Sequence, residues 1–358
     1  MDDISLLGWG LLAAVACAAF VLALLGPAQR FGLVDHPAGR KNHAAPTPLI
    51  GGLAMFLALA VAFALAGLLP VQSVSLMLAV LVTVGIGVAD DAHEIGHRSK
   101  FFAQLVAALL IVSGTEVHVM RLGDLFGAGD VVLDKWSHLI TVVSIIGLMN
   151  AINMIDGLDG LAGSQVLVAL LVLAGVAASA GSPWALELAI VAGAVAGFLV
   201  FNMRSPWRPR ARTFMGDTGG LLLGLLLAWY AVRLGGAPGA SLRPITAVWI
   251  IAVPLLDMGA VMFLRMTQHK SPFLADRQHL HYVLHDAGLS VSQVVAMMAG
   301  LSIALSALAL AAQAHGVPEA AMFVGFVALL LAYGGLLARP SVVARLFGPQ
   351  ARSVRAPD

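Results

Sequence analysis

The chain has 358 residues, of which 60% are hydrophobic and only 11% are charged. Soluble domains carry about 25% charged residues, so this composition excludes an ordinary soluble protein and predicts an integral membrane protein. The formal net charge of +1 carries no information about partners, and the one cysteine, Cys17, excludes an intramolecular disulfide.

Apolar runs near the length of a transmembrane helix recur along the whole chain. About 20 residues are needed to cross a bilayer. Eleven runs approach that length, at residues 4–26, 49–69, 73–90, 101–118, 132–152, 162–180, 184–201, 214–233, 244–264, 291–313 and 318–338. We therefore expect an all-α, polytopic membrane protein that forms one domain over residues 1–358. The first run lacks a preceding basic segment, so we expect it to be retained and not cleaved as a signal peptide.

The distribution of Lys and Arg predicts the orientation. An odd number of crossings places the termini on opposite sides of the membrane. With the N-terminus outside, sixteen of the twenty Lys and Arg residues fall in the inner segments, and four fall outside: Arg121, Lys135, Arg233 and Arg243. The positive-inside rule therefore predicts a periplasmic N-terminus and a cytoplasmic C-terminus.

Three short acidic segments lie at the cytoplasmic ends of the expected helices. They are Asp90–Asp91, the sequence NAINMIDGLDG at 150–160, and Asp217 in FMGDTGG. Charged groups at membrane depth are costly and usually serve a function. Any one segment alone could be a solvated loop or part of a proton relay. Because all three fall on one face and lie beside glycines, we expect them to form one site.

The residue types in these segments favour a divalent cation bound to phosphate. Asn150, Asn153, Asp156 and Asp159 recur every three residues, so neighbours share a helical face. Such hard oxygen ligands suit Mg²⁺, which usually takes one or two carboxylates plus substrate phosphates. Asp217 lies at a predicted helix start, where phosphate is favoured. A bridging cation would remove the repulsion between this carboxylate and a phosphate.

Basic and aromatic residues on the same face suit an anionic substrate. Lys100 and Arg265 lie nearest the acids and are candidates for phosphate contact. Phe214 could stack on a base, although packing in the core is the commoner role of phenylalanine. His279, His281 and His285 in DRQHLHYVLH have a spacing that a transition-metal site could use, but a site for sugar or phosphate is favoured because no thiolate accompanies them.

These motifs together resemble those of a known family. The matching segments are PTPLIGG, the pair Asp90–Asp91, KFFAQ, NMIDGLDGLAG, FMGDTGG, PLLD and SPFLADRQHLHYVL. In this order and on one face, the chain resembles the polyprenyl-phosphate N-acetylhexosamine-1-phosphate transferases, the MraY/WecA superfamily, almost from end to end. Within it, HLHY at 279–282 is most similar to the bacterial branch that transfers GlcNAc-1-phosphate to undecaprenyl phosphate. That branch often has histidine where Tyr282 stands, which leaves other UDP-N-acetylhexosamines open as the donor.

The resemblance implies a reaction, a cofactor and partners. A UDP-sugar, in this case UDP-GlcNAc, and undecaprenyl phosphate give UMP and a diphosphate-linked lipid sugar, in the first membrane step of a cell-surface polysaccharide pathway of O-antigen, enterobacterial common antigen or teichoic acid type. The expected cofactor is Mg²⁺, with Mn²⁺ as an alternative. The expected place is the bacterial inner membrane, crossed several times, with no nucleic-acid partner and a homodimer left open.

The resemblance also implies roles for individual residues. Asp90 and Asp91 resemble the carboxylates that activate the lipid phosphate, and Asp156 and Asp159 resemble active-site acids. Metal ligation is implied for Asp217 and Asn153. Substrate contacts are implied for Asn153, Phe214, Lys100, Arg265, Asp276, Arg277, His279 and His281. Direct in-line attack by the lipid phosphate is favoured, and a double displacement through a covalent aspartyl intermediate is the alternative.

Two other classes of protein remain in competition. A secondary transporter also uses intramembrane acids, but its site should lie near the midplane with broken helices. A prenyltransferase that uses a polyprenyl diphosphate also gathers aspartates around Mg²⁺. It would need Asp-rich segments of the D-x-x-x-D kind, and DGLDG has a different spacing.

Overall fold

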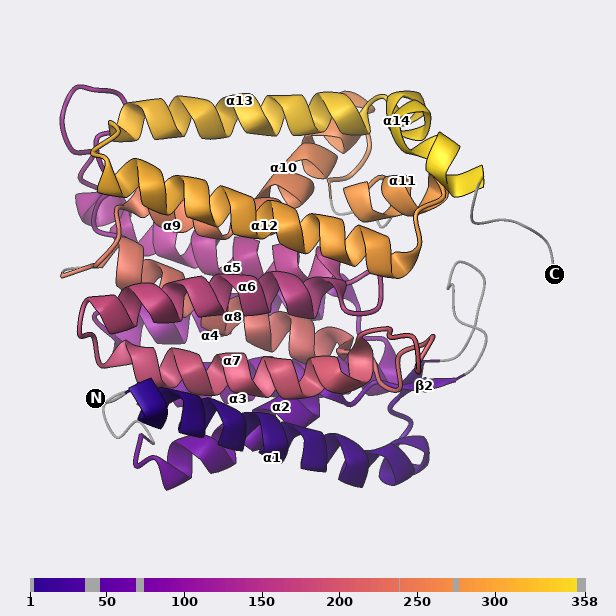
Figure 1. Ribbon diagram of the computed structural model, residues 1–358. Helices are drawn as coiled ribbons and strands as arrows, with labels where there is room; N and C mark the ends of the chain where they lie inside the picture. Colours follow the sequence, from indigo (N-terminus) through magenta and orange to yellow (C-terminus); the bar gives the residue numbers. More distant parts are fainter. Residues whose placement is uncertain (1–2, 36–45, 69–73, 238, 273–276, 353–358) are drawn as a thin grey trace.

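The computed structural model describes residues 3–35, 46–68, 74–237, 239–272 and 277–352, with side chains placed between residues 6 and 346 of these ranges. The described residues are almost entirely helical. Long helices run side by side between the two ends of a bundle. The start of α1 lies at one end, and α11, α14 and β2 lie at the other (Figure 1).

Helices make up nearly every element of the chain. The first half contains α1 (Asp3–Arg30), β1 (Val34–Asp35), β2 (Thr47–Pro48), α2 (Gly51–Leu65), α3 (Val74–His93), α4 (His97–Gly114), the 3₁₀ turn η1 (Asp134–Trp136), α5 (Ser137–Ile155) and α6 (Leu161–Ser179). The second half contains α7 (Trp184–Asn202), α8 (Gly216–Gly235), α9 (Pro244–Ile250), α10 (Ala252–Thr267), α11 (Leu280–Asp286), α12 (Val291–Ala314), α13 (Glu319–Leu337) and α14 (Pro340–Arg352). The two strands form an antiparallel pair.

The helical, polytopic architecture agrees with the sequence prediction. Each of the eleven apolar runs overlaps a helix or a pair of helices. Within the described residues, eight helices are long and apolar enough to cross a membrane, or nine if α9 and α10 form one span. Two expected spans fall outside this set: α2 has only 15 residues, and α4 begins with the polar sequence HRSK.

The prediction of one continuous helix over residues 244–264 was wrong. The chain bends by 82° between α9 and α10. Pro254, in the first turn of α10, has no N–H to donate to the carbonyl of Ile250, which frees that carbonyl and disfavours a straight helix. The hydroxyl of Ser306 on α12 donates to the Ile250 carbonyl at 3.5 Å. A side chain of a neighbouring helix thus replaces the bond that the proline removes.

α8 is the buried centre of the bundle, since 94% of the residues in its 18-residue hydrophobic stretch are buried. Glycines let α2 and α3 approach its first turn very closely. A Cβ at Gly52 would lie 2.1 Å from the backbone nitrogen of Gly219, and one at Gly87 would lie 2.4 Å from Cα of Thr218. Small residues at such crossings are typical of helices that pack within membranes. The acidic end of α3 is thereby held against the start of α8.

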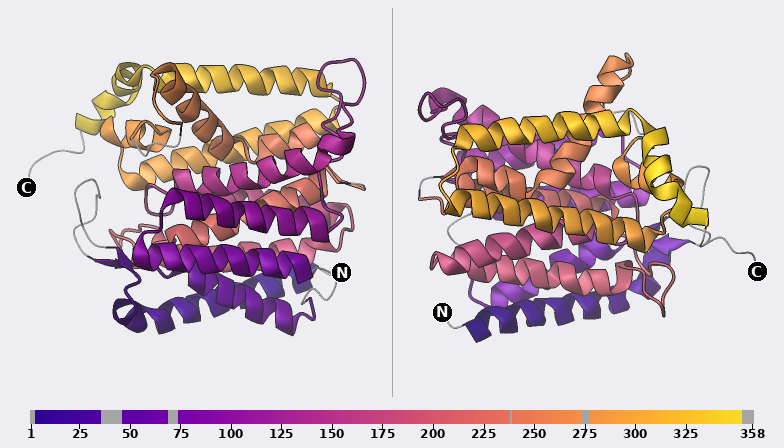
Figure 2. Two further views of the ribbon diagram at one scale, coloured as in Figure 1. Left: turned by 180° about the vertical axis from the view of Figure 1, so that it is seen from behind. Right: turned by 45° about the horizontal axis from the view of Figure 1, so that its top comes forward.

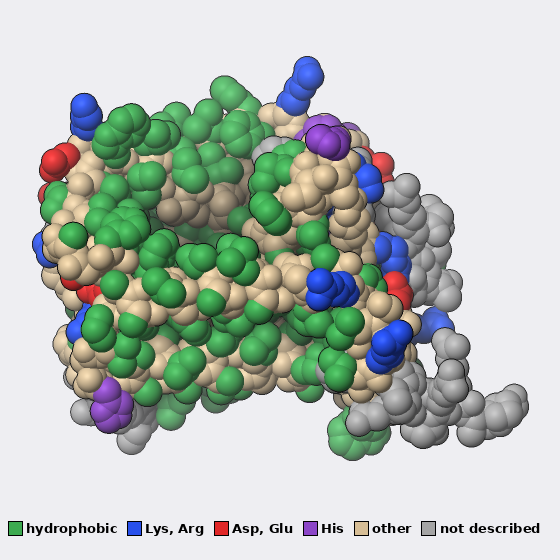
Figure 3. Space-filling model, turned by 90° about the horizontal axis from the view of Figure 1, so that it is seen from above, with side chains coloured by type: hydrophobic (Ala, Val, Ile, Leu, Met, Phe, Trp, Pro, Cys, Tyr) green, Lys and Arg blue, Asp and Glu red, His purple; other side chains and the backbone are tan. Residues whose placement is uncertain are grey.

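The two sides of the bundle differ in the helices that they carry. α1 and α13 lie on opposite sides in both views of Figure 2. Seen from the side of α13, the surface is mostly hydrophobic, is hollowed in its middle and carries charged side chains mainly toward its ends (Figure 3). Val324 and Leu331 on α13 are each 65% exposed. Such a surface is suited to contact with lipid chains.

Candidate active site

A lysine joins two of the predicted acids at one end of the bundle. Asp90 lies near the end of α3, Lys100 in the first turn of α4 and Asp217 in the first turn of α8. The Lys100 ammonium donates to Asp90 Oδ2 at 3.0 Å and to Asp217 Oδ2 at 2.7 Å. The other oxygen of Asp90 is buried and has no hydrogen-bond partner among the described residues. The structure thus brings together two segments that are more than 100 residues apart in the chain.

Asp91, the neighbour of Asp90, binds the N-terminus of α8. Its Oδ1 accepts from the backbone N–H of Asp217 at 2.7 Å. Its Oδ2 accepts from the backbone N–H of Thr218 at 3.1 Å and from the Thr218 hydroxyl at 2.6 Å. A carboxylate from another helix therefore caps α8, where free N–H groups and the helix dipole favour negative charge.

Glycine is required at the residue before Asp217. Gly216 has a φ of +70°, which side chains rarely adopt. A Cβ at this position would also lie 2.5 Å from Asp91 Oδ2. Gly216 of FMGDTGG therefore serves the approach of the capping carboxylate, a role that the sequence alone did not reveal.

The end of α5 brings an amide and a carboxylate to the same region. Asn153 lies against α8, because a Cβ at Gly220 would lie 2.9 Å from Asn153 Oδ1. Asp156 follows directly after α5 and is partly buried. Burial, together with the nearby charges of Asp217, Asp159 and Asp91, raises the pKa of Asp156 to about 7. Near neutral pH this carboxyl group is therefore able to hold or to release a proton.

Asp159 is engaged by the loop that follows α7. Its Oδ2 accepts from Nε of Arg204 at 2.6 Å and from the backbone N–H of Ala211 at 3.3 Å. Asn202, at the end of α7, accepts from the N–H of Gly160 at 2.7 Å and donates to the carbonyl of Thr213 at 2.9 Å. These contacts fix the DGLDG turn to the segment that leads into α8. Asn202 was not among the predicted site residues, and only its place at the end of a helix before a basic loop could have pointed to it.

The segment into α8 is in turn fixed to the first loop. Phe214 is partly exposed, and its backbone N–H donates to the carbonyl of Pro48 at 2.9 Å. The hydroxyl of Thr213 donates to the same carbonyl at 2.9 Å. The backbone of Phe214 is thus held between β2 and the start of α8.

Two of the predicted residues, Arg265 in the last turns of α10 and His279 directly before α11, are buried together with Asp257. The carboxylate of Asp257 pairs with His279 Nδ1 at 2.6 Å. Arg265 is 1% exposed and donates from one guanidinium nitrogen to the carbonyl of Pro272 at 2.7 Å. The second terminal nitrogen of Arg265 lies 3.5 Å from His279 Nε2. Asp276, also predicted to bind substrate, lies outside the described residues.

The other two predicted residues of this segment lie in or beside α11. Arg277 is exposed, pairs with Asp286 at 3.1 Å and stacks over the ring of Tyr282 with its guanidinium carbon 4.5 Å from the ring centroid. His281 is fully buried, and burial lowers its pKa to about 3, so the ring is neutral at pH 7. Within the described part of the chain, no group of three or more His, Cys, Asp or Glu side chains could hold a metal ion by itself, which gives no support to a histidine metal site.

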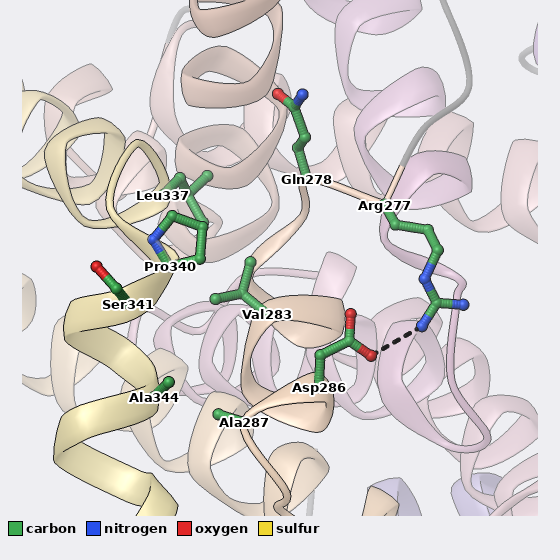
Figure 4. Close-up of a pocket in the computed structure, with 9 residues that line it drawn as sticks. All are labelled: Arg277, Gln278, Val283, Asp286, Ala287, Leu337, Pro340, Ser341 and Ala344. Carbon is green, nitrogen blue, oxygen red and sulfur yellow. Dashed lines mark hydrogen bonds and ion pairs between the residues drawn. The ribbon is translucent and has the colours of Figure 1, made fainter.

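A pocket of about 350 Å³ lies between α11 and α14 (Figure 4). Its lining includes Val283 and Ala287 of α11 and Leu337 and Pro340 near α14, with the Arg277–Asp286 pair at one side. Of the predicted site residues that the structure describes, Arg277 is the one found in this lining. The lining of this pocket includes none of the five clustered carboxylates, so the pocket is separate from them.

Comparison with known proteins identifies the family. Residues 73–235 match the glycosyl transferase family 4. The undecaprenyl-phosphate alpha-N-acetylglucosaminyl 1-phosphate transferase of Salmonella typhi is 31% identical over 339 residues, which cover 94% of this chain and 92% of that protein. This chain belongs to that transferase family.

Further relatives agree with this membership. The enzyme of the same name from Haemophilus influenzae is 32% identical over 314 residues, 86% of each chain. That from Escherichia coli K12 is 30% identical over 331 residues, 92% of this chain and 90% of the relative. The resemblance inferred from the motifs is therefore confirmed. The segment matched by glycosyl transferase family 4 extends from the start of α3 to the end of α8, so it includes all five acids of the site, from Asp90 to Asp217.

Proposed function

We propose that this chain transfers GlcNAc-1-phosphate from UDP-GlcNAc to undecaprenyl phosphate and releases UMP. The observation that carries this proposal is the meeting of Asp90, Lys100 and Asp217 at one end of the bundle. The relatives named undecaprenyl-phosphate alpha-N-acetylglucosaminyl 1-phosphate transferase align with about nine-tenths of this chain. In this reaction an oxygen of the lipid phosphate attacks the phosphorus attached to the sugar. The bond from that phosphorus to the UMP oxygen breaks, and the electron pair leaves with UMP.

Charge neutralisation is the main demand of this reaction, because both substrates are anions. Lys100 lies between two carboxylates and is placed to move to a phosphate oxygen once substrate enters. Asp91 is already bound by three donors of α8, whereas one oxygen of Asp90 has no partner among the described residues. Of this pair, Asp90 is therefore the better candidate to hold or deprotonate the lipid phosphate.

The residues at the end of the bundle fit a divalent cation. The buried, unpartnered oxygen of Asp90, a carboxylate oxygen of Asp217 and the amide oxygen of Asn153 are hard donors that suit Mg²⁺ or Mn²⁺. Five carboxylates gather at this end, while Lys100 and Arg204 are the cations paired with them among the described residues. The excess of negative charge supports a bound cation. When bound, Mg²⁺ would neutralise the pyrophosphate and the UMP leaving group.

We further propose that the chain crosses the bacterial inner membrane eleven times, with the N-terminus in the periplasm and the site at the cytoplasmic face. The bias of sixteen Lys and Arg residues against four supports this orientation. The start of α1 and the elements α11 and α14 lie at opposite ends of the bundle, as an odd number of crossings requires (Figure 1). The hydrophobic, hollowed surface beside α13 suits the polyprenyl chain (Figure 3).

A transporter is the competing interpretation, and the bent pair α9–α10 is a feature that transporters share. The acids, however, lie at the end of α3, after the end of α5 and at the start of α8. Their position at helix ends favours chemistry at the membrane surface over passage through the midplane.

The decisive assay uses purified protein with undecaprenyl phosphate, Mg²⁺ and a panel of UDP-amino sugars, with UMP release as the readout. UDP-GlcNAc should give the fastest release, and Asp217→Asn should abolish it. Asp130→Asn is a matched control, because Asp130 pairs with Arg121 at 3.1 Å on the exposed outer loop. Uptake of intact UDP-sugar into proteoliposomes without UMP formation would instead support a transporter and refute the proposal.

A further inference from the structure

A buried hydrogen-bond network connects α13 to the segment that carries His279. Asp257 on α10 is 1% exposed, and both of its oxygens are engaged. Oδ2 pairs with Nδ1 of His279 at 2.6 Å. Oδ1 accepts from the backbone N–H of Leu280 at 3.0 Å and from the hydroxyl of Tyr333 on α13 at 2.9 Å. One carboxylate thus joins α10, the start of α11 and α13.

The two partners of His279 fix its tautomer. Asp257 offers only acceptors, so Nδ1 of His279 carries the hydrogen. A guanidinium offers only donors, so the Nε2 that Arg265 faces at 3.5 Å carries none. The ring of His279 is therefore engaged on both sides by the protein. Its role in this arrangement is to hold Arg265 and α11, which leaves the adjacent histidine to face a ligand.

His281 has the environment expected of a ligand-binding group, because its polar atoms are buried and have no protein partner among the described residues. It is fully buried, and neither ring nitrogen has a hydrogen-bond partner among the described residues. Its ring stacks on that of His279 with the centroids 5.5 Å apart. A Cβ at Gly157 would lie 2.2 Å from its Nε2, so the ring lies against the DGLDG turn beside Asp156. An unpaired buried polar group is costly, and a polar substrate would relieve that cost.

We propose that Tyr333 is a positioning residue that holds the Asp257–His279 pair in register and thereby places His281 for the UDP-sugar. The proposal rests on the transferase function already proposed. Tyr333 is about 50 residues beyond α11 in the chain, and its hydroxyl is already donated to Oδ1 of Asp257, so it acts on the site through that carboxylate. Loss of its hydroxyl would leave Oδ1 of Asp257 with the Leu280 N–H alone. α11 would then be free to shift relative to the DGLDG turn.

The chain contains a closely matched control. Tyr230 on α8 is also buried, and its hydroxyl donates to Oε2 of Glu187 on α7 at 3.0 Å. Tyr230→Phe and Tyr333→Phe therefore remove the same hydroxyl from the same kind of buried tyrosine–carboxylate pair. Glu187 lies in the first turn of α7 and Tyr230 is far along α8, away from the helix ends that carry the acids. Only the Tyr333 pair is connected to α11.

The experiment compares KM and kcat for the wild type and both variants. In Tyr333→Phe we expect the KM for UDP-GlcNAc to rise about five-fold, as for the loss of one net hydrogen bond of about 1 kcal/mol. The kcat and the KM for undecaprenyl phosphate should change by less than about two-fold. Tyr230→Phe should leave both KM values unchanged. In a His279→Gln background, Tyr333→Phe should have little further effect, because the two residues act through one pair.

The remaining outcomes overturn the proposal in distinct ways. Equal changes in the two tyrosine variants would mean a general packing effect, and an unchanged KM in Tyr333→Phe would mean that α11 does not depend on this hydroxyl. A Tyr333→Phe protein that does not fold would assign Tyr333 to folding alone. If the wild type released no UMP, the proposed function would fail separately. Tyr333 would then be tested by the rise in unfolding midpoint that UDP-GlcNAc causes, which only Tyr333→Phe should reduce.

Discussion

Asp90 and Asp91 are adjacent in the chain, yet the structure predicts that their removal has different consequences. Asp91 accepts three hydrogen bonds at the first turn of α8, from the N–H of Asp217 and from the N–H and hydroxyl of Thr218. Asp90 has one ion pair, to Lys100 at 3.0 Å. We therefore expect Asp91→Ala to destabilise the fold and Asp90→Ala to affect mainly the reaction.

The size of the difference follows from the contacts. Loss of a helix cap costs up to about 2 kcal/mol, and the upper end applies to Asp91 because its three donors are partly buried. For large domains about 1 kcal/mol shifts the unfolding midpoint by roughly 2–4 °C, so Asp91→Ala should lower it by about 5 °C. Loss of a partly exposed ion pair costs about 0–1 kcal/mol. Asp90→Ala should therefore shift the midpoint by less than about 3 °C.

The chain provides its own reporter of unfolding. Cys17 on α1 is the one cysteine and is fully buried, so a thiol-reactive fluorescent dye will label it only as the bundle opens. UMP release, measured well below the midpoints, should fall in both variants. Thr218→Val, which removes only the hydroxyl donor, should give a midpoint between those of Asp91→Ala and the wild type. An Asp91→Ala protein that is inactive but as stable as the wild type would refute the capping role and would indicate that Asp91 acts directly in the reaction.

Three further substitutions test the site. Lys100→Met removes the cation between two carboxylates and should lower UMP release by about 10²-fold; activity within about three-fold of wild type would contradict its role. The pKa of Asp156 rises from 3.8 to about 7, so the folded protein binds this proton more tightly and loses stability as the pH rises from about 4 through 7. In the absence of Mg²⁺, Asp156→Asn should therefore unfold at a higher temperature than wild type at pH 8, with the difference vanishing near pH 4; a pH-independent difference would refute this. Gly157→Ala places a Cβ 2.2 Å from His281 Nε2 and should raise the KM for UDP-GlcNAc, whereas Gly175→Ala, where a Cβ meets nothing within 4 Å, should not.

The sequence predicted the features that depend on local composition. Apolar runs gave the helices, and the bias of Lys and Arg led us to place the acids on one face. Asp90, Lys100 and Asp217 do meet, because each lies at the end or the start of a helix that the hydrophobic pattern located. Family motifs added the transferase assignment. These predictions succeeded because helix ends on the same side of a membrane are necessarily close to one plane.

Other features depend on contacts between distant segments and were beyond the sequence. Asp91 was grouped with Asp90, although it caps α8. Tyr333 lies in an apolar run, and nothing near it in the chain points to Asp257, which is 76 residues away. The bend before α10 did have a signal in Pro254, but a proline inside an apolar run also occurs in continuous membrane helices. Its effect depended on Ser306 of α12, which accommodates the freed carbonyl.

The acids of the site differ in their partners, and these partners explain how the fold tolerates so many carboxylates at the edge of a membrane. Asp91 accepts three hydrogen bonds at the first turn of α8, Asp159 pairs with Arg204 and the Ala211 N–H, and Asp217 pairs with Lys100. Asp156 and one oxygen of Asp90 have no such partner among the described residues. An uncompensated, partly buried carboxylate raises the free energy of the ligand-free state. That cost falls when cationic groups and substrate enter, so the same acids that destabilise the empty site favour its occupation.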